Sequence, residues 1–297
     1  MDTRYLNKKG FGKYIFFIGF VLLIISLFVL LYRDFSTKSV SKNTDLEVVF
    51  LDVGQGDAIY IEAPNGAQMI VDGGKGSVLS NAILPYINPF DKSIDYLVVT
   101  NPDKDHYEGF ISLMDRYQIG MILQSGTRQD DITYSVFKNK VAEEDVPYEV
   151  VRKGDEIVLD KEAGVYATVL FPDRDVTNWE RNDGSVVLLL THGENQFLLM
   201  GDGTILTEGI LVASGTDLDG VDVLKLGHHG SKTSTGWPII NATTPEYAIV
   251  SAAEYNSYGH PHKEVINRLT EYGSKILETK DGSIAFYSDG LTLRYEQ

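Results

Sequence analysis

The stretch VVTNPDKDHYEGF, residues 98–110, follows a run of β-branched residues with four polar side chains in six positions. These are Asn101, Asp103, Asp105 and His106. Carboxylate and imidazole groups hold divalent cations in proteins, and a bound cation can activate water for hydrolysis. The cluster therefore predicts a metal site at the end of a strand. It contains only one histidine, so most of its donor atoms are oxygen.

Polar residues of similar types follow other predicted strands. They lie in loops and are carboxylates, amides and histidines: Asp52, Asp57, Asp72, Asn182, Asp183, Asp202, His228, His229, His260 and His262. A lone histidine in a loop is usually just solvated. Several histidines and carboxylates gathered at strand ends favour a functional site instead.

The elements that must position these residues are short and rich in β-branched residues. Strands are predicted at residues 46–53, 57–63, 67–74, 95–100, 165–171, 185–191, 196–202, 221–227 and 247–253, and helices near 77–87, 106–117, 203–214 and 262–272. Strand-rich runs with helices interspersed are typical of an α/β domain whose sheets are covered by helices. This periodicity is compatible with several layered folds.

The bulk composition excludes several kinds of site. The chain has 297 residues, a formal net charge of −16 and no cysteine. Without cysteine there is no disulfide, thiolate zinc site or cysteine nucleophile. A surface this negative repels phosphate backbones, so any contact with nucleic acid must be local, metal-bridged or made by a small basic patch.

The N-terminal region predicts a membrane anchor. Residues 14–32 are 19 residues without a charge, long enough to cross a bilayer as a helix. Cations precede and follow them, and the bias favours a cytoplasmic N-terminus, residues 1–13, and a single-pass protein in the cell membrane. Residues 33–45 then form a polar tether, and residues 46–297 form an extracytoplasmic domain. The alternative is a cleaved signal peptide, whose apolar region should be shorter.

The motifs resemble those of a known group. FLDVGQGDA, TNPDKDHYEGF, NDGSVVLLL, MGDG, LKLGHHGSKTST and YGHPH occur in the order typical of the metallo-β-lactamase superfamily. The chain is most similar to the metallo-β-lactamase-like domain of the ComEC competence proteins, over roughly residues 46–297. The resemblance implies an αββα sandwich, in which two sheets face each other, helices lie outside, and a metal site lies at one edge.

The signature loop departs from its relatives at one position. The superfamily pattern is H-x-H-x-D-H, and the ComEC group often has H-x-D-x-D-H. Asp103 matches the second pattern, and Asp105 and His106 match both. Asn101 matches neither, and its neutral amide binds zinc poorly.

By resemblance, the site holds one or two divalent metal ions per chain, Zn or Mn, with Asp202 as a shared ligand. One ion would take these ligands: Asp105, His106, Asp202 and His228, with His229 as the alternative to His228. The other would take a set that is almost all oxygen: Asn101, Asp103, Asp202, and Asp183 or Asn182. Oxygen-only surroundings favour manganese, magnesium or calcium over zinc.

Other residues have predicted supporting roles. Asp105 and His260 are the predicted catalytic residues, with His260 placed to protonate a leaving group by analogy with related hydrolases. Asp72 should support the metal loop through hydrogen bonds, and Asp57 should do the same or face substrate. The glycine-rich DVGQGD has no P-loop lysine and no following helix pattern, so a tight turn is the better interpretation.

These residues favour a membrane-anchored, metal-dependent hydrolase, either a phosphodiesterase or a nuclease. Its expected partners are the membrane, through residues 14–32, and a phosphate-containing substrate such as a nucleic acid; no protein partner is predicted. One alternative is hydrolysis of another ester or lactam. The other, from a different class, is a binding or scaffolding domain that kept the fold and lost turnover, and Asn101 is its best support.

Overall fold

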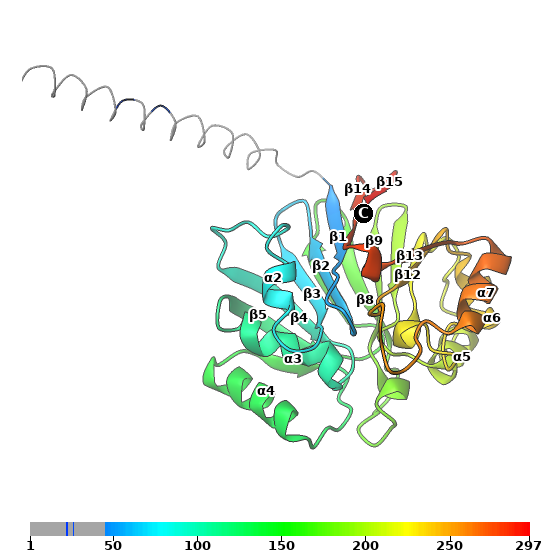
Figure 1. Ribbon diagram of the computed structural model, residues 1–297, viewed down its shortest axis with the longest axis horizontal. Coiled ribbons are helices and arrows are strands. Elements are labelled where there is room, and N and C mark those ends of the chain that lie inside the picture. The colour runs from blue at the N-terminus through cyan, green and yellow to red at the C-terminus, as the bar shows by residue number, and fades with distance from the viewer. Residues whose placement is uncertain (1–21, 23–25, 27–44) are drawn as a thin grey trace, which may run out of the picture. The chain divides into compact units, whose positions relative to one another are not determined.

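Two sheets, each with both antiparallel and parallel strand pairs, form the centre of the computed structural model (Figure 1). Within the described residues, the first sheet has the strand order β15 (Leu293–Glu296), β14 (Ile284–Ser288), β1 (Leu46–Phe50), β2 (Ala58–Glu62), β3 (Gln68–Gly73), β4 (Ser93–Val99), β5 (Gln118–Gln124) and β6 (Tyr148–Val150). The second has the order β13 (Lys275–Glu278), β12 (Tyr247–Val250), β11 (Val223–Lys225), β10 (Asn195–Leu199), β9 (Val187–His192), β8 (Val165–Phe171) and β7 (Glu156–Asp160).

Helices cover the outer faces of both sheets. The first sheet carries α2 (Leu79–Ala82), α3 (Lys104–Leu113) and α4 (Ile132–Glu143), and the second carries α5 (Ile205–Ala213), α6 (Trp237–Thr243) and α7 (Lys263–Tyr272). Figure 1 shows the two groups of helices on opposite sides of the paired sheets. Three short 3₁₀ segments complete the described part: η1 (Asn182–Gly184), η2 (Gly227–Gly230) and η3 (Thr279–Asp281). The predicted αββα sandwich is thus confirmed.

Alternation along the strands explains the layers. Val48 and Phe50 of β1 point between the sheets, where Phe50 meets Phe286 edge-to-face at a ring-centroid distance of 6.0 Å. Val49 points the other way, into the core under α2 and α3. Successive side chains of a strand face opposite sides, so an apolar run such as that of β1 fills both layers. Truncating a buried aromatic such as Phe50 to alanine costs about 3–5 kcal/mol.

The topology brings the polar loops together. β3, β4 and β5 are neighbouring parallel strands, as are β10, β11 and β12. Parallel strands end at the same edge of a sheet, and ligand sites of α/β proteins lie beyond those carboxyl ends. The loops after β4, β10 and β11 contain the predicted metal-site residues except Asp183, which lies between β8 and β9, so both sheets contribute side chains to one edge.

Several elements differ from the sequence prediction. α3 begins at Lys104 and ends at Leu113, earlier than the predicted 106–117, because Asp103 adopts the extended backbone of an N-cap. The helix predicted near 77–87 is only the short α2, followed by turns. α4 and α6 were not predicted: polar residues interrupt the apolar ones of α4, such as Phe137, and α6 is only 7 residues long.

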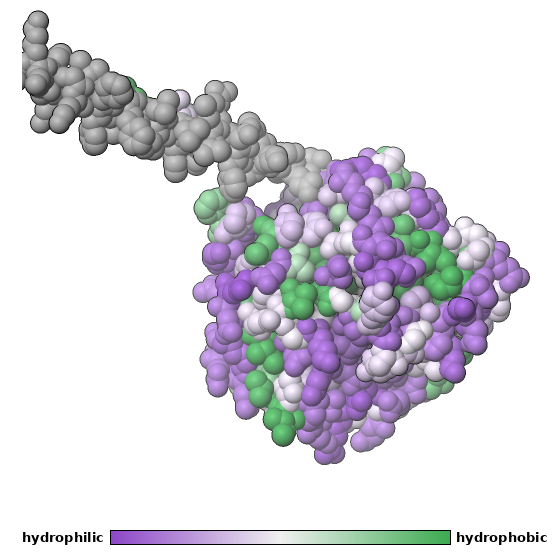
Figure 2. Space-filling view, viewed as in Figure 1, coloured by the Kyte–Doolittle hydropathy of each residue, from purple (hydrophilic) through white to green (hydrophobic). Residues whose placement is uncertain are grey.

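The structure describes residues 22, 26 and 45–297. The chain divides into two units, residues 1–42 and residues 43–297, and every element named above belongs to the second. On the face shown in Figure 2 the surface of that unit is mostly hydrophilic, with apolar residues in small groups. No helix among the described residues has the length and apolar character needed to cross a bilayer. The anchor predicted at 14–32 lies outside them, except for residues 22 and 26.

Candidate metal centre

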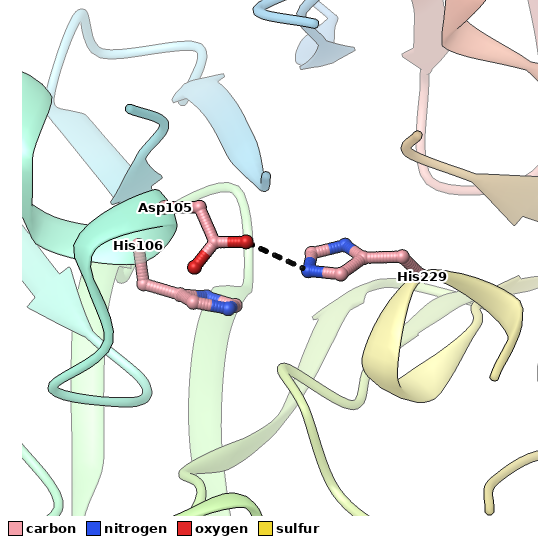
Figure 3. Close-up of side chains that lie close together, drawn as sticks. All are labelled: Asp105, His106 and His229. Atoms are coloured by element: carbon pink, nitrogen blue, oxygen red, sulfur yellow. Dashed lines mark ion pairs between the residues drawn. The ribbon is translucent and has the colours of Figure 1, made fainter. Parts of the chain in front are cut away.

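Two histidines that follow strands of different sheets face each other at the edge where those strands end. His106 comes from the first turn of α3 and His229 from η2, and their rings stack with centroids 5.4 Å apart. Figure 3 shows Asp105 directed at His229, with its Oδ2 3.5 Å from Nε2 of that ring. Donor atoms of Asp105, His106 and His229 all lie within 4.8 Å of one another.

Asp202 joins this group from the loop after β10. Its Oδ2 lies 3.0 Å from Nε2 of His106, and its Oδ1 lies 3.4 Å from Nε2 of His229. Asp202 is 3% exposed, so its charge is almost fully removed from water. Burial by itself raises the pKa of Asp202, but His106 and His229 lower it well below its ordinary value. The carboxylate is therefore ionised and able to bind a cation.

The opposite nitrogen of each ring is held by a buried carboxylate. Nδ1 of His106 lies 2.7 Å from Oδ2 of Asp72. Asp72 also accepts a hydrogen bond from the Thr100 amide at Oδ1 and one from the Thr100 hydroxyl at Oδ2. Nδ1 of His229 lies 3.1 Å from Oδ1 of Asp57. A carboxylate can only accept, so in each neutral ring the proton stays on Nδ1 and Nε2 keeps its lone pair. A cation that displaces the Nε2 protons would meet both lone pairs directed at the centre, the usual arrangement around metal-binding histidines.

A buried lysine fixes Asp57 in turn. Nζ of Lys225, which is 0% exposed, donates to Oδ2 of Asp57 at 2.9 Å and to the carbonyl of Leu226 at 2.8 Å. Burial raises the pKa of Asp57, but Lys225 and His229 lower it to about 2. A buried charge without a partner is strongly destabilising, so the two charges need each other. This lysine was not predicted as a site residue, because the sequence gives no sign that it pairs with a residue 168 positions away.

Backbone geometry at the site is unusual. His228 and His229 have positive φ angles of 46° and 55°, and Asp72 has 59°. Residues other than glycine adopt this region at a cost and mostly where function requires it. Gly56 of DVGQGD lies so close to Asp105 that a Cβ there would be 2.3 Å from its carbonyl oxygen. Only glycine lets this turn reach the first turn of α3.

The donor atoms at the centre fit a divalent cation. Among the described residues, Nε2 of His106, Nε2 of His229 and Oδ1 of Asp202 are buried and have no hydrogen-bond partner. Buried polar atoms are nearly always paired, so three such atoms facing one point call for a bound group. Burial lowers the pKa of His229, yet Asp202 and Asp57 raise it to about 10, so the site attracts positive charge. Imidazole and carboxylate donors suit zinc and manganese alike.

The residues predicted for the second ion are already engaged within the protein. Oδ1 of Asn101 accepts from the Asp103 amide at 2.9 Å, and its Nδ2 donates to Oδ1 of Asn182 at 2.7 Å. Oδ1 of Asp103 lies 2.5 Å from Nε of Arg181. Asp183 accepts from the Thr204 hydroxyl at 2.5 Å, at the start of α5. Neither Asp103 nor Asp183 belongs to the groups of His, Asp and Glu side chains that could hold a metal ion in the described part of the chain.

His228 and His260 line the wall of the centre. The sequence interpretation preferred His228 over His229 as a ligand, but the structure places His229 in the metal-binding groups. His228 instead lies 3.2 Å from the Thr233 hydroxyl, and its ring is 5.3 Å from that of His260. Burial, with the neighbouring His228 and His229, lowers the pKa of His260 to about 4, so this ring is neutral at pH 7. Its Nδ1 is buried and unpaired among the described residues.

Two cavities give access to these groups. A small one of about 100 Å³ reaches the metal-binding side chains and is lined by Gln55, Asp103, Asp105, Asp202, His228, His229, Tyr258 and His260. A larger one of about 550 Å³ shares Gln55, Asp103, Asp105 and Tyr258 with it. Three cations, Lys75, Lys104 and Arg181, line the larger cavity. Three carboxylates, Asp103, Asp105 and Asp131, line the same cavity, so positive and negative side chains are balanced there although the protein as a whole is strongly acidic.

No family model matches the chain. Among solved structures, the metallo-β-lactamase fold protein YhfI from Bacillus subtilis aligns with a TM-score of 0.52 at 12% identity, over 78% of this chain and 96% of that one. CmlA, a diiron β-hydroxylase from Streptomyces venezuelae, also gives a TM-score of 0.52, at 14% identity, over 79% of this chain and 52% of its own. The described unit therefore has the metallo-β-lactamase fold.

Three curated proteins are similar in sequence. Recombination protein 2 of Haemophilus influenzae is 28% identical, over 93% of this chain and 32% of that protein. ComE operon protein 3 of Bacillus subtilis is 30% identical, over 81% of this chain and 33% of that protein. Competence protein ComA of Neisseria gonorrhoeae is 29% identical, over 86% of this chain and 34% of that protein. The chain thus spans about a third of the length of these relatives. Its folded unit is a metallo-β-lactamase-like domain of the ComEC type.

Proposed function

We propose that this domain is a metal-dependent hydrolase of phosphodiesters. The observation that carries the proposal is the convergence of three buried, unpaired donor atoms, from His106, His229 and Asp202, beside the Asp105 carboxylate. A divalent cation held there would supply Lewis acidity and a nucleophilic water at neutral pH. This donor set is the part of the site that a decayed relative would not be expected to retain.

The chain's own residues fit a phosphate ester better than a neutral substrate. Lys75, Lys104 and Arg181 line the larger cavity and can bind phosphate oxygens. The neutral His260 lies on the wall of the smaller cavity, where its unpaired Nδ1 can accept or pass a proton. Asp105 combines a place in the donor set with exposure to both cavities. The substrate class is therefore a phosphodiester, with nucleic acid as one source.

The test uses the full-length protein, stripped of metal and reloaded with manganese or zinc. We expect hydrolysis of a chromogenic bis-aryl phosphate, with manganese at least as effective as zinc, and loss of hydrolysis in His229→Ala. His192→Gln is the matched control, because His192 ends β9 and lies outside both cavities. Metal binding without turnover of any phosphodiester would favour a binding or scaffolding domain. Turnover of a lactam or lactone alone would favour the other hydrolase class.

We further propose that residues 14–32 anchor the chain in the cell membrane, with the domain outside the cytoplasm. The support is the uncharged apolar run with cations before it. Protease added to intact cells should then digest the domain. Complete protection until lysis would reverse this topology.

A further inference from the structure

We propose that this chain binds one divalent ion and that the guanidinium of Arg181 takes the place of a second. The ion count rests on the geometry alone. The role of Arg181 in turnover rests also on the proposed hydrolase function, and the two parts are tested separately below.

The first observation is the ion pair at the position where the second cation is expected. Oδ1 of Asp103 lies 2.5 Å from Nε of Arg181. Asp103 is the residue that matches the second position of the H-x-D-x-D-H pattern, so the arginine occupies the carboxylate that would otherwise ligate metal. A guanidinium keeps its proton at any pH at which a protein is folded. Asp103 therefore faces a permanent positive charge.

The second observation is that Asn101 and Asp183 each already make a hydrogen bond within the protein through a side-chain oxygen. The side-chain oxygen of Asn101 accepts from the backbone of Asp103, and the residue is fully buried, so it cannot turn toward the centre without leaving that amide unpaired. Asp183 binds the Thr204 hydroxyl instead. Binding a second ion here would compete with these contacts and place a divalent charge beside Arg181, where like charges repel.

The location of Arg181 suits a role in turnover. It lines the larger cavity, while its partner Asp103 lines both the larger and the smaller one. The side chain is 38% exposed, so part of its guanidinium remains available to a ligand. In phosphodiester hydrolysis, water adds to phosphorus, the ester P–O bond breaks, and the alcohol leaves with a proton that originates from the water. The guanidinium would bind a non-bridging oxygen and stabilise the charge that develops there.

The first experiment counts metal and does not depend on activity. Full-length protein saturated with manganese should contain one ion per chain and give the EPR spectrum of an isolated Mn²⁺. Arg181→Gln should still bind one, because Asn101 remains a poor ligand. The double variant Asn101→His/Arg181→Gln, which frees Asp103 and adds an imidazole, should bind two ions with an exchange-coupled spectrum. Two ions, or none, in the unaltered protein would overturn the proposal.

The second experiment measures turnover of a bis-aryl phosphate in the same proteins. Arg181→Gln should lower kcat roughly a hundredfold with its one ion retained, as for other groups that stabilise developing charge, and Arg181→Lys should recover part of it. Arg128→Gln is the matched control, since Arg128 pairs with Asp130 on the surface. An unchanged kcat in Arg181→Gln would overturn the role of Arg181. If the unaltered protein has no phosphodiesterase activity, the proposed function fails, while the ion count still decides the first part.

Discussion

Two neighbouring positions in this domain differ both in residue type and in the contacts that their side chains make. At the first, His106 and His229 each use Nδ1 to bind a buried carboxylate, and their Nε2 atoms make no hydrogen bond but face the carboxylate of Asp202. At the second, Asn101 and Asp103 are bound to other groups of the protein, including Arg181. The difference shows that a cation site needs several donor atoms that make no hydrogen bond within the protein and point toward the same place. The presence of acidic and amide residues is not sufficient.

The largest expected effect is at Asp202, which contacts both histidines of the first position. Asp202→Ala should lose the bound metal and at least about a thousandfold in hydrolysis rate, or roughly 4 kcal/mol of transition-state stabilisation. Bound metal per chain and kcat/KM of the full-length protein are the measurements. Retention of both metal and activity would show that the first position is not the metal centre.

The next effect separates two adjacent histidines. His229→Ala removes a free Nε2 and should weaken metal affinity by more than about a hundredfold, a loss larger than that typical for residues behind the ligands. His228→Ala should keep the metal, since His228 lies outside the metal-binding groups of the described residues. Titration of the metal-free variants with manganese measures the metal affinity of each. Equal losses in the two variants would mean that His228 is a ligand as well.

A smaller effect is expected behind the ligands. Asp57→Asn should weaken metal affinity about 10–100-fold, because the amide no longer fixes the His229 ring as the carboxylate does. It also leaves the buried charge of Lys225 uncompensated, which should destabilise folding by about 3–5 kcal/mol. Chemical denaturation gives the free energy of unfolding, and metal titration gives the affinity. Pairing the change with Lys225→Met should recover stability but not affinity; recovery of affinity would argue against a positioning role for Asp57.

The smallest effect on metal is expected at the second position. Asn101→Ala should change the affinity for the first ion by less than about threefold, because its neutral amide contributes little charge and already binds other groups. It should still lower stability by about 1–3 kcal/mol, since the buried amide of Asp103 loses its acceptor. A large loss of bound metal in this variant would place Asn101 among the ligands and remove the contrast between the two positions.

The order of motifs was sufficient to predict the αββα sandwich and the edge at which the polar loops meet. The resemblance of the motifs to the superfamily carries that information, since strand and helix patterns alone were compatible with several layered folds. Helices with weak apolar patterns, such as α4 and α6, were missed, because their stability comes from packing against neighbouring elements rather than from their own periodicity. Asp105, His106 and Asp202 were chosen from sequence, and the structure brings them together.

The sequence by itself determined which residue types reach the site, and the tertiary structure decided which atoms are free to act there. Sequence favoured His228 with His229 as the alternative, but both lie in a turn with positive φ, where the side-chain directions depend on contacts made elsewhere. Asp57 reaches His229 across 172 positions and Lys225 across 168. Arg181 likewise meets Asp103 only after the two sheets pack. Such pairings depend on distance in space, which a linear pattern does not contain.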